Sequence, residues 1–142
     1  MLAANNWEDA CRIRFEIEGK KCSKQTAGIL PKIREVDAEM TPQLQRRIRE
    51  GHPEVSFAMM NNRRPMTFSK KTQQGKDDRR ALLAHHFPDL TDHLTEIPGA
   101  IIDILDAYAC LWTARRIVRD QGKCFPGDIE RDSLGLAAEI VA

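Results

Sequence analysis

The chain has 142 residues, of which 42% are hydrophobic, and this suits a single domain over residues 1–142 with a modest core. Its formal net charge of +1 gives no overall field that would draw it onto nucleic acid. The first residues lack the apolar run of a signal peptide, and the four cysteines form no CxxC pair, which argues against a zinc site. These features predict a cytoplasmic protein with reduced thiols.

The first third of the chain is predicted to be mainly helical. Residues 6–18 place apolar side chains along one helical face, although the alternation in RIRFEIE also fits a strand. Ser23 is a suitable N-cap for a second helix, in which Pro31 predicts a kink or a new start. Thr41 and Pro42 form a cap and first-turn pair for a further short helix.

A strand is predicted over residues 47–52, followed by a short helix that begins at Pro53. A continuous strand through Phe57 is the alternative, but Pro53 argues against a central one. In both cases Glu50 and His52 point to the same side, because side chains alternate along a strand. Glu54 then lies close to them, near the positive end of the short helix.

The middle of the chain combines basic residues with loops and helices. Residues 63–80 contain seven Lys/Arg and two Asp, which suits either a solvated face or a surface that meets phosphates. The polar stretch SKKTQQGK (69–76) predicts a mobile loop, followed by a helix over 77–86 and a short helix or turn over 89–96. Residues 135–141 predict a short strand.

The most informative stretch is GAIIDILDAYACLWTARR (99–116), which predicts a core helix that begins at Pro98-Gly99. It is shorter than the roughly 20 apolar residues that a membrane span needs, and it contains two aspartates, so no membrane association is expected. At helical spacing one stripe is formed by Asp103, Asp106, Cys110 and Thr113. Burial of an unpaired carboxylate costs several kcal/mol, so this stripe calls for a cation, a proton or donors.

Together these carboxylates suggest a metal site. Asp103 and Asp106, with Glu50 and Glu54 at the strand end, are the hard oxygen ligands that suit Mg²⁺ or Mn²⁺. Two such ions can assist cleavage of a phosphodiester. Asp103 also suits the helix dipole, Glu50 can be a surface acid, and His52 fits a structural role better than that of a ligand. The nucleic-acid backbone would then be held by the basic residues Lys70, Lys71, Arg79 and Arg80.

Several blocks resemble domain-of-unknown-function family 429, whose members are regarded as predicted RNase H-like nucleases. The resemblance covers about residues 23–117 and the GLAAEIVA ending, and it includes the HPE, SKKT and D-x-x-D-A blocks in that order. It implies an RNase H-like α/β fold. The Asp pair on the last helix of such nucleases corresponds to Asp103 and Asp106, and the E-x-H-P-E block corresponds to Glu50, His52 and Glu54.

The chain also departs from the family pattern. Gly51 replaces a usual apolar residue and weakens its strand, and neither the G-x-D-G strand nor the D-x-P-x-G strand occurs. The fold expected is therefore an N-terminally truncated, helix-rich α/β domain with a small sheet remnant. The expected activity is that of an Mg²⁺- or Mn²⁺-dependent nuclease, weak or inactive without the first-strand Asp. The alternative is a non-catalytic binding module that forms a homo-oligomer through an exposed strand edge.

Overall fold

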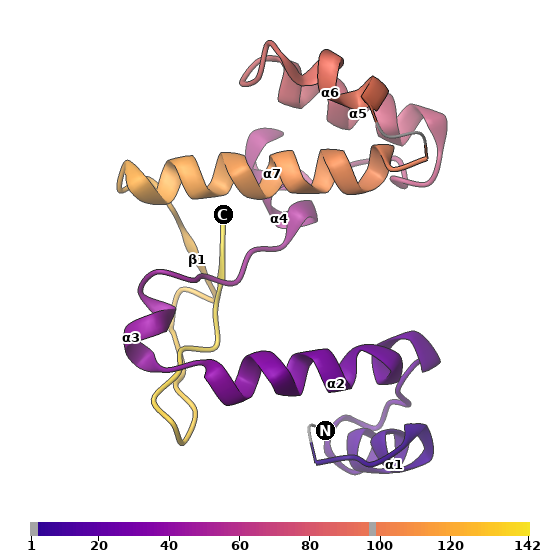
Figure 1. The fold of residues 1–142 in the computed structure, drawn as a ribbon, viewed down its shortest axis with the longest axis vertical. Coiled ribbons are helices and arrows are strands. Elements are labelled where there is room, and N and C mark those ends of the chain that lie inside the picture. Colours follow the sequence, from indigo (N-terminus) through magenta and orange to yellow (C-terminus); the bar gives the residue numbers. More distant parts are fainter. Residues whose placement is uncertain (1–2, 97–98) are drawn as a thin grey trace. The chain divides into compact units, whose positions relative to one another are not determined.

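The computed structural model describes residues 3–96 and 99–142, and the chain divides into two compact units, Met1–Gln45 and Arg46–Ala142. The expected single domain over residues 1–142 stays a prediction. The described residues form seven helices and one two-stranded sheet, so the chain is a helix-rich α/β protein (Figure 1). The expected helix start at Pro98 lies outside the described residues.

The helices of the first unit begin and end where local signals predict. Helix α1, Trp7–Glu18, has Asn6 as its N-cap, whose side chain accepts from the Asp9 backbone N–H at 2.8 Å. It ends at Gly19, whose φ of 68° is the left-handed conformation that glycine adopts most readily. The helical prediction for this segment is therefore confirmed, and the strand alternative is excluded.

Helix α2, Lys24–Glu39, begins at the predicted cap Ser23 and runs through Pro31 without a new start. Helix α3, Pro42–Gln45, follows Thr41, whose hydroxyl accepts from the Leu44 backbone N–H at 3.1 Å. The small core of this unit is formed by the buried side chains of Ala4, Ala10, Cys22 and Leu30.

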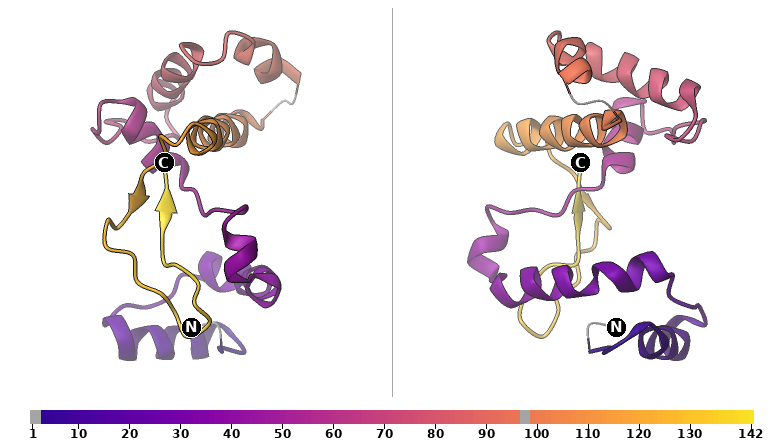
Figure 2. Two further views of the ribbon diagram at one scale, coloured as in Figure 1. Left: turned by 90° about the vertical axis from the view of Figure 1, so that its left-hand side faces the viewer. Right: turned by 45° about the vertical axis from the view of Figure 1, so that its right-hand side comes forward.

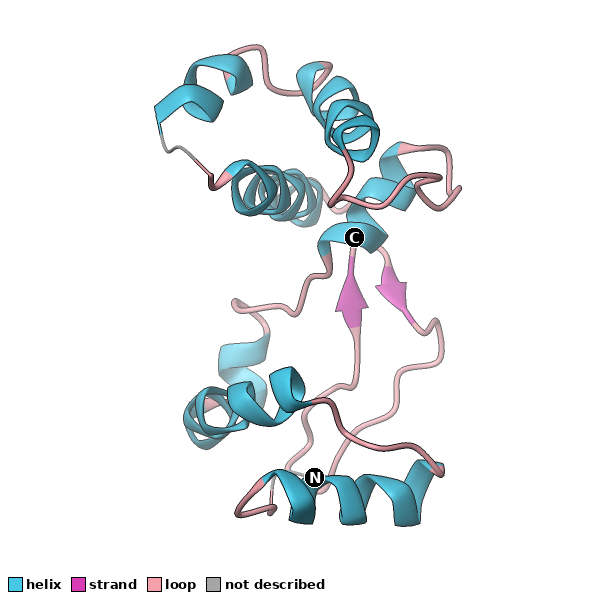
Figure 3. Ribbon diagram, turned by 90° about the vertical axis from the view of Figure 1, so that its right-hand side faces the viewer, coloured by secondary structure: helices cyan, strands magenta, loops and turns pink. Residues whose placement is uncertain are grey.

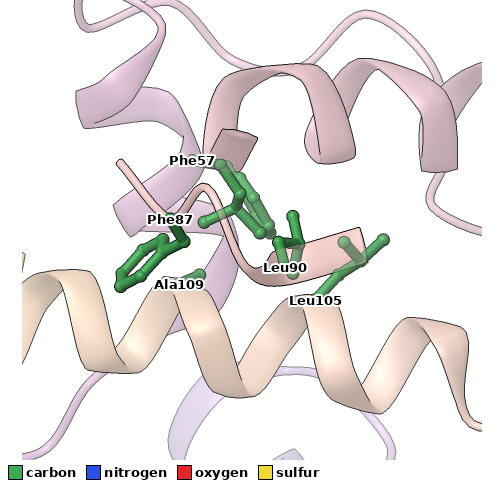
Figure 4. Close-up of a cluster of buried hydrophobic side chains, with 6 residues drawn as sticks. Phe57, Phe87, Leu90, Leu105 and Ala109 are labelled. Atoms are coloured by element: carbon green, nitrogen blue, oxygen red, sulfur yellow. The ribbon is translucent and has the colours of Figure 1, made fainter. Parts of the chain in front are cut away.

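The second unit is built around helix α7, Ile101–Val118. Helices α4 (Pro53–Met60), α5 (Gln73–Ala84) and α6 (Leu90–Glu96) contact it. Both views in Figure 2 show α5 and α6 on one side of α7 and the two strands on the other. The core between these helices consists of Phe57, Leu83, Phe87, Leu90, Leu105 and Ala109. Figure 4 shows how side chains from several helices meet there against α7.

Helix α5 begins four residues earlier than the sequence predicts, so the expectation of a loop over residues 69–76 is wrong for its second half. Thr72 caps the helix by accepting from the Gly75 backbone N–H at 3.1 Å. Gly75 packs so tightly that a Cβ built on it would lie 2.0 Å from the carbonyl oxygen of Ser69. This turn is therefore fixed by a backbone contact that needs glycine.

The sheet is small. Strands β1 (Cys124–Phe125) and β2 (Ile140–Val141) pair antiparallel, with Cys124 opposite Val141 (Figure 3). A parallel bridge joins Gly51 to the other side of β2, where the Val141 N–H donates to the Glu50 carbonyl at 2.8 Å. The strand predicted over residues 47–52 is thus wrong except at this bridge. Pro53 begins α4 before a strand can continue beyond Gly51.

Candidate functional site

The polar stripe of α7 has a single carboxylate at its centre. Asp106 accepts from the Lys70 ammonium through Oδ2 at 2.6 Å, and its side chain is only 20% exposed. Its other oxygen, Oδ1, is buried and has no hydrogen-bond partner. Leaving a buried acceptor unsatisfied costs about 1–3 kcal/mol, and a cation or a donor beside this oxygen would remove that cost.

The neighbouring polar residues of the stripe have different environments. Asp103, one turn before Asp106, is exposed, and so is Cys110, one turn after it. Thr113 is buried, and its hydroxyl bonds that of Ser56 on α4 at 2.7 Å. Within the stripe, Asp103 and Cys110 are thus open to solvent, Asp106 is half-buried and Thr113 belongs to the core.

Glu50 lies beside the same stretch of α7. Its exposed side chain lines a cavity of about 450 Å³, which is also bordered by Gly51, Cys110 and Thr113. Although Cys110 is exposed as a residue, partial desolvation of its thiol raises the pKa of that thiol, and the negative charge of Asp106 raises it further. Glu50 thus lies beside the part of α7 that follows Asp106, and Asp106 itself does not line this cavity.

Glu54 is not part of this group. Its carboxylate forms a two-point ion pair with the guanidinium of Arg79, with contacts of 2.7 Å and 3.2 Å. Arg79 is only 2% exposed and also donates to the carbonyls of Phe68 and Gly75. The sequence-based assignment of Arg79 to nucleic-acid binding is therefore corrected. Its donors are used inside the protein, where they fix α5 against α4.

The other basic residues assigned to nucleic acid differ in availability. Lys70 is paired with Asp106, and Arg80 pairs with Asp77 at 3.1 Å on the surface of α5. Lys71 is exposed. His52 is exposed and precedes α4, where its carbonyl accepts from the backbone N–H groups of α4 and its side chain makes no capping bond.

The four predicted carboxylates do not converge on one point. Within residues 3–96 and 99–142, no group of three or more His, Cys, Asp or Glu side chains is placed to hold a metal ion. Asp106, with its unpartnered Oδ1 and with Asp103 one turn away on the same helix, is the carboxylate that best suits an oxygen-binding cation. The four cysteines are free thiols.

A second polar pocket, which was not predicted from the sequence, lies at the other end of α7. It is lined by Trp112, by two arginines of the last turn of α7, by Arg119 just after the helix, and by the two adjacent histidines of the HHF segment (85–87). The signal in the sequence was the run WTARRIVR, whose basic residues recur after a tryptophan with no intervening acid. Only the fold places the HHF segment beside it.

Comparison with known families decides the classification. The model of the family described as "Protein of unknown function (DUF429)" matches residues 1–131. The chain belongs to this family. No curated protein and no solved structure matches it. The DUF429 assignment confirms the resemblance that the HPE, SKKT and D-x-x-D-A blocks indicated. Among the described helices, none is long and apolar enough to cross a membrane.

Proposed function

We propose that this DUF429 chain is the carboxylate-bearing helical part of an RNase H-like, metal-dependent nuclease that acts on phosphodiesters of nucleic acid. The observation that carries the proposal is the buried, unpartnered Oδ1 of Asp106. An acceptor of this kind, on the helix where the family resemblance expects an acidic pair, suits a cation ligand. In the absence of the ion, the Lys70 ammonium neutralises the other oxygen of the same carboxylate.

Asp106 would hold the ion, with Asp103, one turn before it on α7, as a second carboxylate, and water or substrate oxygens would complete the coordination. Glu50 is not grouped with them. Mg²⁺ or Mn²⁺ supplies charge stabilisation for the oxygens of a phosphodiester under attack. Asp106 would fix the position of the ion. Lys71, the exposed residue next to Lys70, would contribute a positive charge that attracts the phosphate backbone of the substrate. Glu54 is left out of the set, because Arg79 uses both of its oxygens.

The described residues offer fewer carboxylates than a two-metal site uses. We therefore propose that the active form completes its metal centre with a further acidic side chain from a second chain or a second copy. Strand β1 has no second neighbour among the described residues, so its free edge can pair with such a partner. The chain alone is then expected to bind metal weakly and to cleave slowly.

The test combines metal binding with cleavage. Mn²⁺ is titrated calorimetrically into the wild type, Asp106→Asn and Asp128→Asn, the last being an exposed matched control. The same proteins are incubated with fluorescent single-stranded and double-stranded oligonucleotides. Binding and cleavage that Asp106→Asn abolishes and Asp128→Asn leaves intact support the proposal. Absence of Mn²⁺ binding, or cleavage that is equal in Asp106→Asn, contradicts it.

A non-catalytic, homo-oligomeric module is the second candidate. It is favoured by the pairing of Glu54 with Arg79 and of Asp106 with Lys70, because carboxylates that are already neutralised need no metal. In that case sedimentation would reveal a stable oligomer whose formation is insensitive to EDTA and to Asp106→Asn, and the Mn²⁺ titration would be flat.

A further inference from the structure

The end of α7 that lies away from Asp103 and Asp106 borders a strongly cationic cavity. Its volume is about 350 Å³, and it lies where the chain after α5 meets the last turns of α7. Among the described residues, no acidic side chain lines it. Its lining includes the basic and aromatic side chains of His85, His86, Trp112, Arg115, Arg116 and Arg119.

Two of the arginines are held in place by aromatic rings. The guanidinium carbon of Arg115 lies 4.6 Å from the ring centroid of Phe87, and that of Arg116 lies 4.7 Å from the ring centroid of Trp112. A guanidinium over a ring uses its face for the cation–π contact and keeps the N–H donors in its plane for other acceptors. The rings therefore restrict these side chains without using up their hydrogen-bonding capacity.

The donors of this site are only partly satisfied. The Nε of Arg116 is buried and lacks a partner, while its Nη2 donates to the carbonyl of Gln121. Within residues 3–96 and 99–142, no carboxylate forms an ion pair with Arg115, Arg116 or Arg119. A buried charged donor without an acceptor is costly, and the oxygen of an anion would satisfy it.

Favourable interaction with the helix dipole explains only part of this arrangement. Cations in the last turn of a helix offset its negative end, which accounts for arginines as a residue type at these positions. It does not account for the unsatisfied Nε of Arg116, nor for two histidines brought to the same cavity by another part of the chain. A bound anion accounts for all of these features.

We propose that this cavity binds a phosphate group, supplied either by a nucleotide or by a single-stranded nucleic acid. Guanidinium N–H groups match phosphate oxygens in spacing and charge, and three of them face one cavity. The cavity is larger than a bare phosphate requires, which leaves room for the adjoining sugar or base. Binding uses neither Asp106 nor a metal ion, so the inference is independent of the proposed cleavage.

Trp112 provides a direct reporter. The chain has two tryptophans, so Trp7→Phe leaves Trp112 as the only one. In this background, inorganic phosphate, a nucleoside monophosphate, and oligonucleotides with and without a 5′-phosphate are titrated in EDTA at constant ionic strength while Trp112 emission is recorded. The variant is Arg115→Gln/Arg119→Gln. The control is Lys20→Gln/Lys32→Gln, which removes two exposed charges from the other unit.

The expected result is a saturable change in emission with phosphate, weakened at least about tenfold in the arginine variant and unchanged in the lysine control. Asp106→Asn is expected to bind as the wild type does, which separates this result from that of the nuclease test. Tighter binding of the mononucleotide identifies a nucleotide as the source of the phosphate, and tighter binding of the oligonucleotides identifies a strand. If Arg115→Gln/Arg119→Gln unfolds, which circular dichroism would show, the exposed Arg119→Gln alone replaces it. No saturable change, or equal affinity in the folded arginine variant, overturns the proposal.

Discussion

Arg79 and Glu54 form a two-point ion pair between α5 and α4, in which Nη2 lies 2.7 Å from Oε2 and Nε lies 3.2 Å from Oε1. The Arg79 side chain is 3% exposed, whereas that of Glu54 is 35% exposed. The guanidinium also donates to two backbone carbonyls and lies 5.4 Å from the ring centroid of Phe57. Arg79 therefore joins two helices and a loop, and its role is structural.

The ion pair of Arg79 with Glu54 predicts a large effect on stability, whereas the surface ion pair of the adjacent Arg80 predicts a small one. Arg79→Ala is expected to lower the free energy of unfolding by roughly 2–4 kcal/mol, because it removes a buried pair and leaves carbonyls without donors. Arg80→Ala removes an exposed ion pair with Asp77 and is expected to change the free energy of unfolding by less than about 0.5 kcal/mol. Urea denaturation of both variants measures the difference. Equal stability, with nucleic-acid affinity lost in Arg79→Ala alone, would restore the surface role that the sequence suggested.

A second prediction concerns two helical glycines with opposite surroundings. Gly75→Ala places a Cβ 2.0 Å from the Ser69 carbonyl oxygen, so the start of α5 must shift, at an expected cost of about 1–3 kcal/mol. Gly28→Ala lies in α2, where nothing is within 4 Å of the new Cβ. It is expected to stabilise the protein by about 0.5–1 kcal/mol. The midpoint temperatures of unfolding of the two variants should therefore shift in opposite directions from that of the wild type. A shift in the same direction would contradict the tight packing at Gly75.

Local signals predicted the helix boundaries well. Ser23, Thr41 and Pro53 act within one turn of their own position, so a cap or a first-turn proline can be recognised without knowledge of the fold. The start of α5 was missed because polar residues and Gly75 resemble a loop. Only the contact with Ser69 shows why glycine is required there.

The candidate site was harder to predict, because its partners are distant in sequence. The pairs Glu54–Arg79 and Lys70–Asp106 join residues 25 and 36 positions apart, and no periodic pattern reveals such a pairing. The sequence therefore identified Asp106 as unusual but could not identify the cation beside it. The cationic cavity at Arg116 was missed for the same reason.

The ion pair between Lys70 and Asp106 is expected to limit how strongly Asp106 binds a metal ion. Lys70→Met removes the ammonium that lies 2.6 Å from Oδ2 and leaves a partly buried carboxylate with both oxygens free. If Asp106 is a metal ligand, the affinity for Mn²⁺ is expected to rise by about tenfold, or about 1.4 kcal/mol. Lys71→Met, at the exposed neighbour, is the matched control and should leave the affinity unchanged. Calorimetry measures both, and an affinity that does not rise in Lys70→Met contradicts a metal at Asp106.

The rate at which the Cys110 thiol is alkylated is expected to report the charge on Asp106. The pKa of the Cys110 thiol is raised by partial burial and by the Asp106 carboxylate. Less thiolate is therefore present at neutral pH, and alkylation accelerates as the pH rises towards this raised pKa. Asp106→Asn removes the second cause, and Cys110 should then react faster with iodoacetamide at pH 7.5. Cys124 is an internal control, because burial and Glu139, not Asp106, raise its pKa. Peptide mass spectrometry distinguishes the two thiols, and an unchanged rate at Cys110 would contradict the contribution of Asp106.

The pKa of His86 links the cationic cavity to pH. Burial lowers this pKa below its ordinary value of 6.5, and the neighbouring charge of His85 lowers it further, in surroundings that also contain Arg115, Arg116 and Arg119. As the pH falls below about 6.5, the unfolded state therefore takes up the proton first. Stability is retained above that pH and decreases as the pH falls towards the lowered pKa of the folded state.

Two measurements test this direction. An NMR titration should give His86 a pKa below 6.5, and His86→Gln should lose less stability than the wild type between pH 7.5 and 5.5 in urea denaturation. Phosphate held by the arginines would favour the imidazolium, so saturating phosphate should raise the pKa of His86. A pKa of His86 that phosphate does not move would place the anion elsewhere, because a phosphate in this cavity lies beside the imidazole and must interact with its charge.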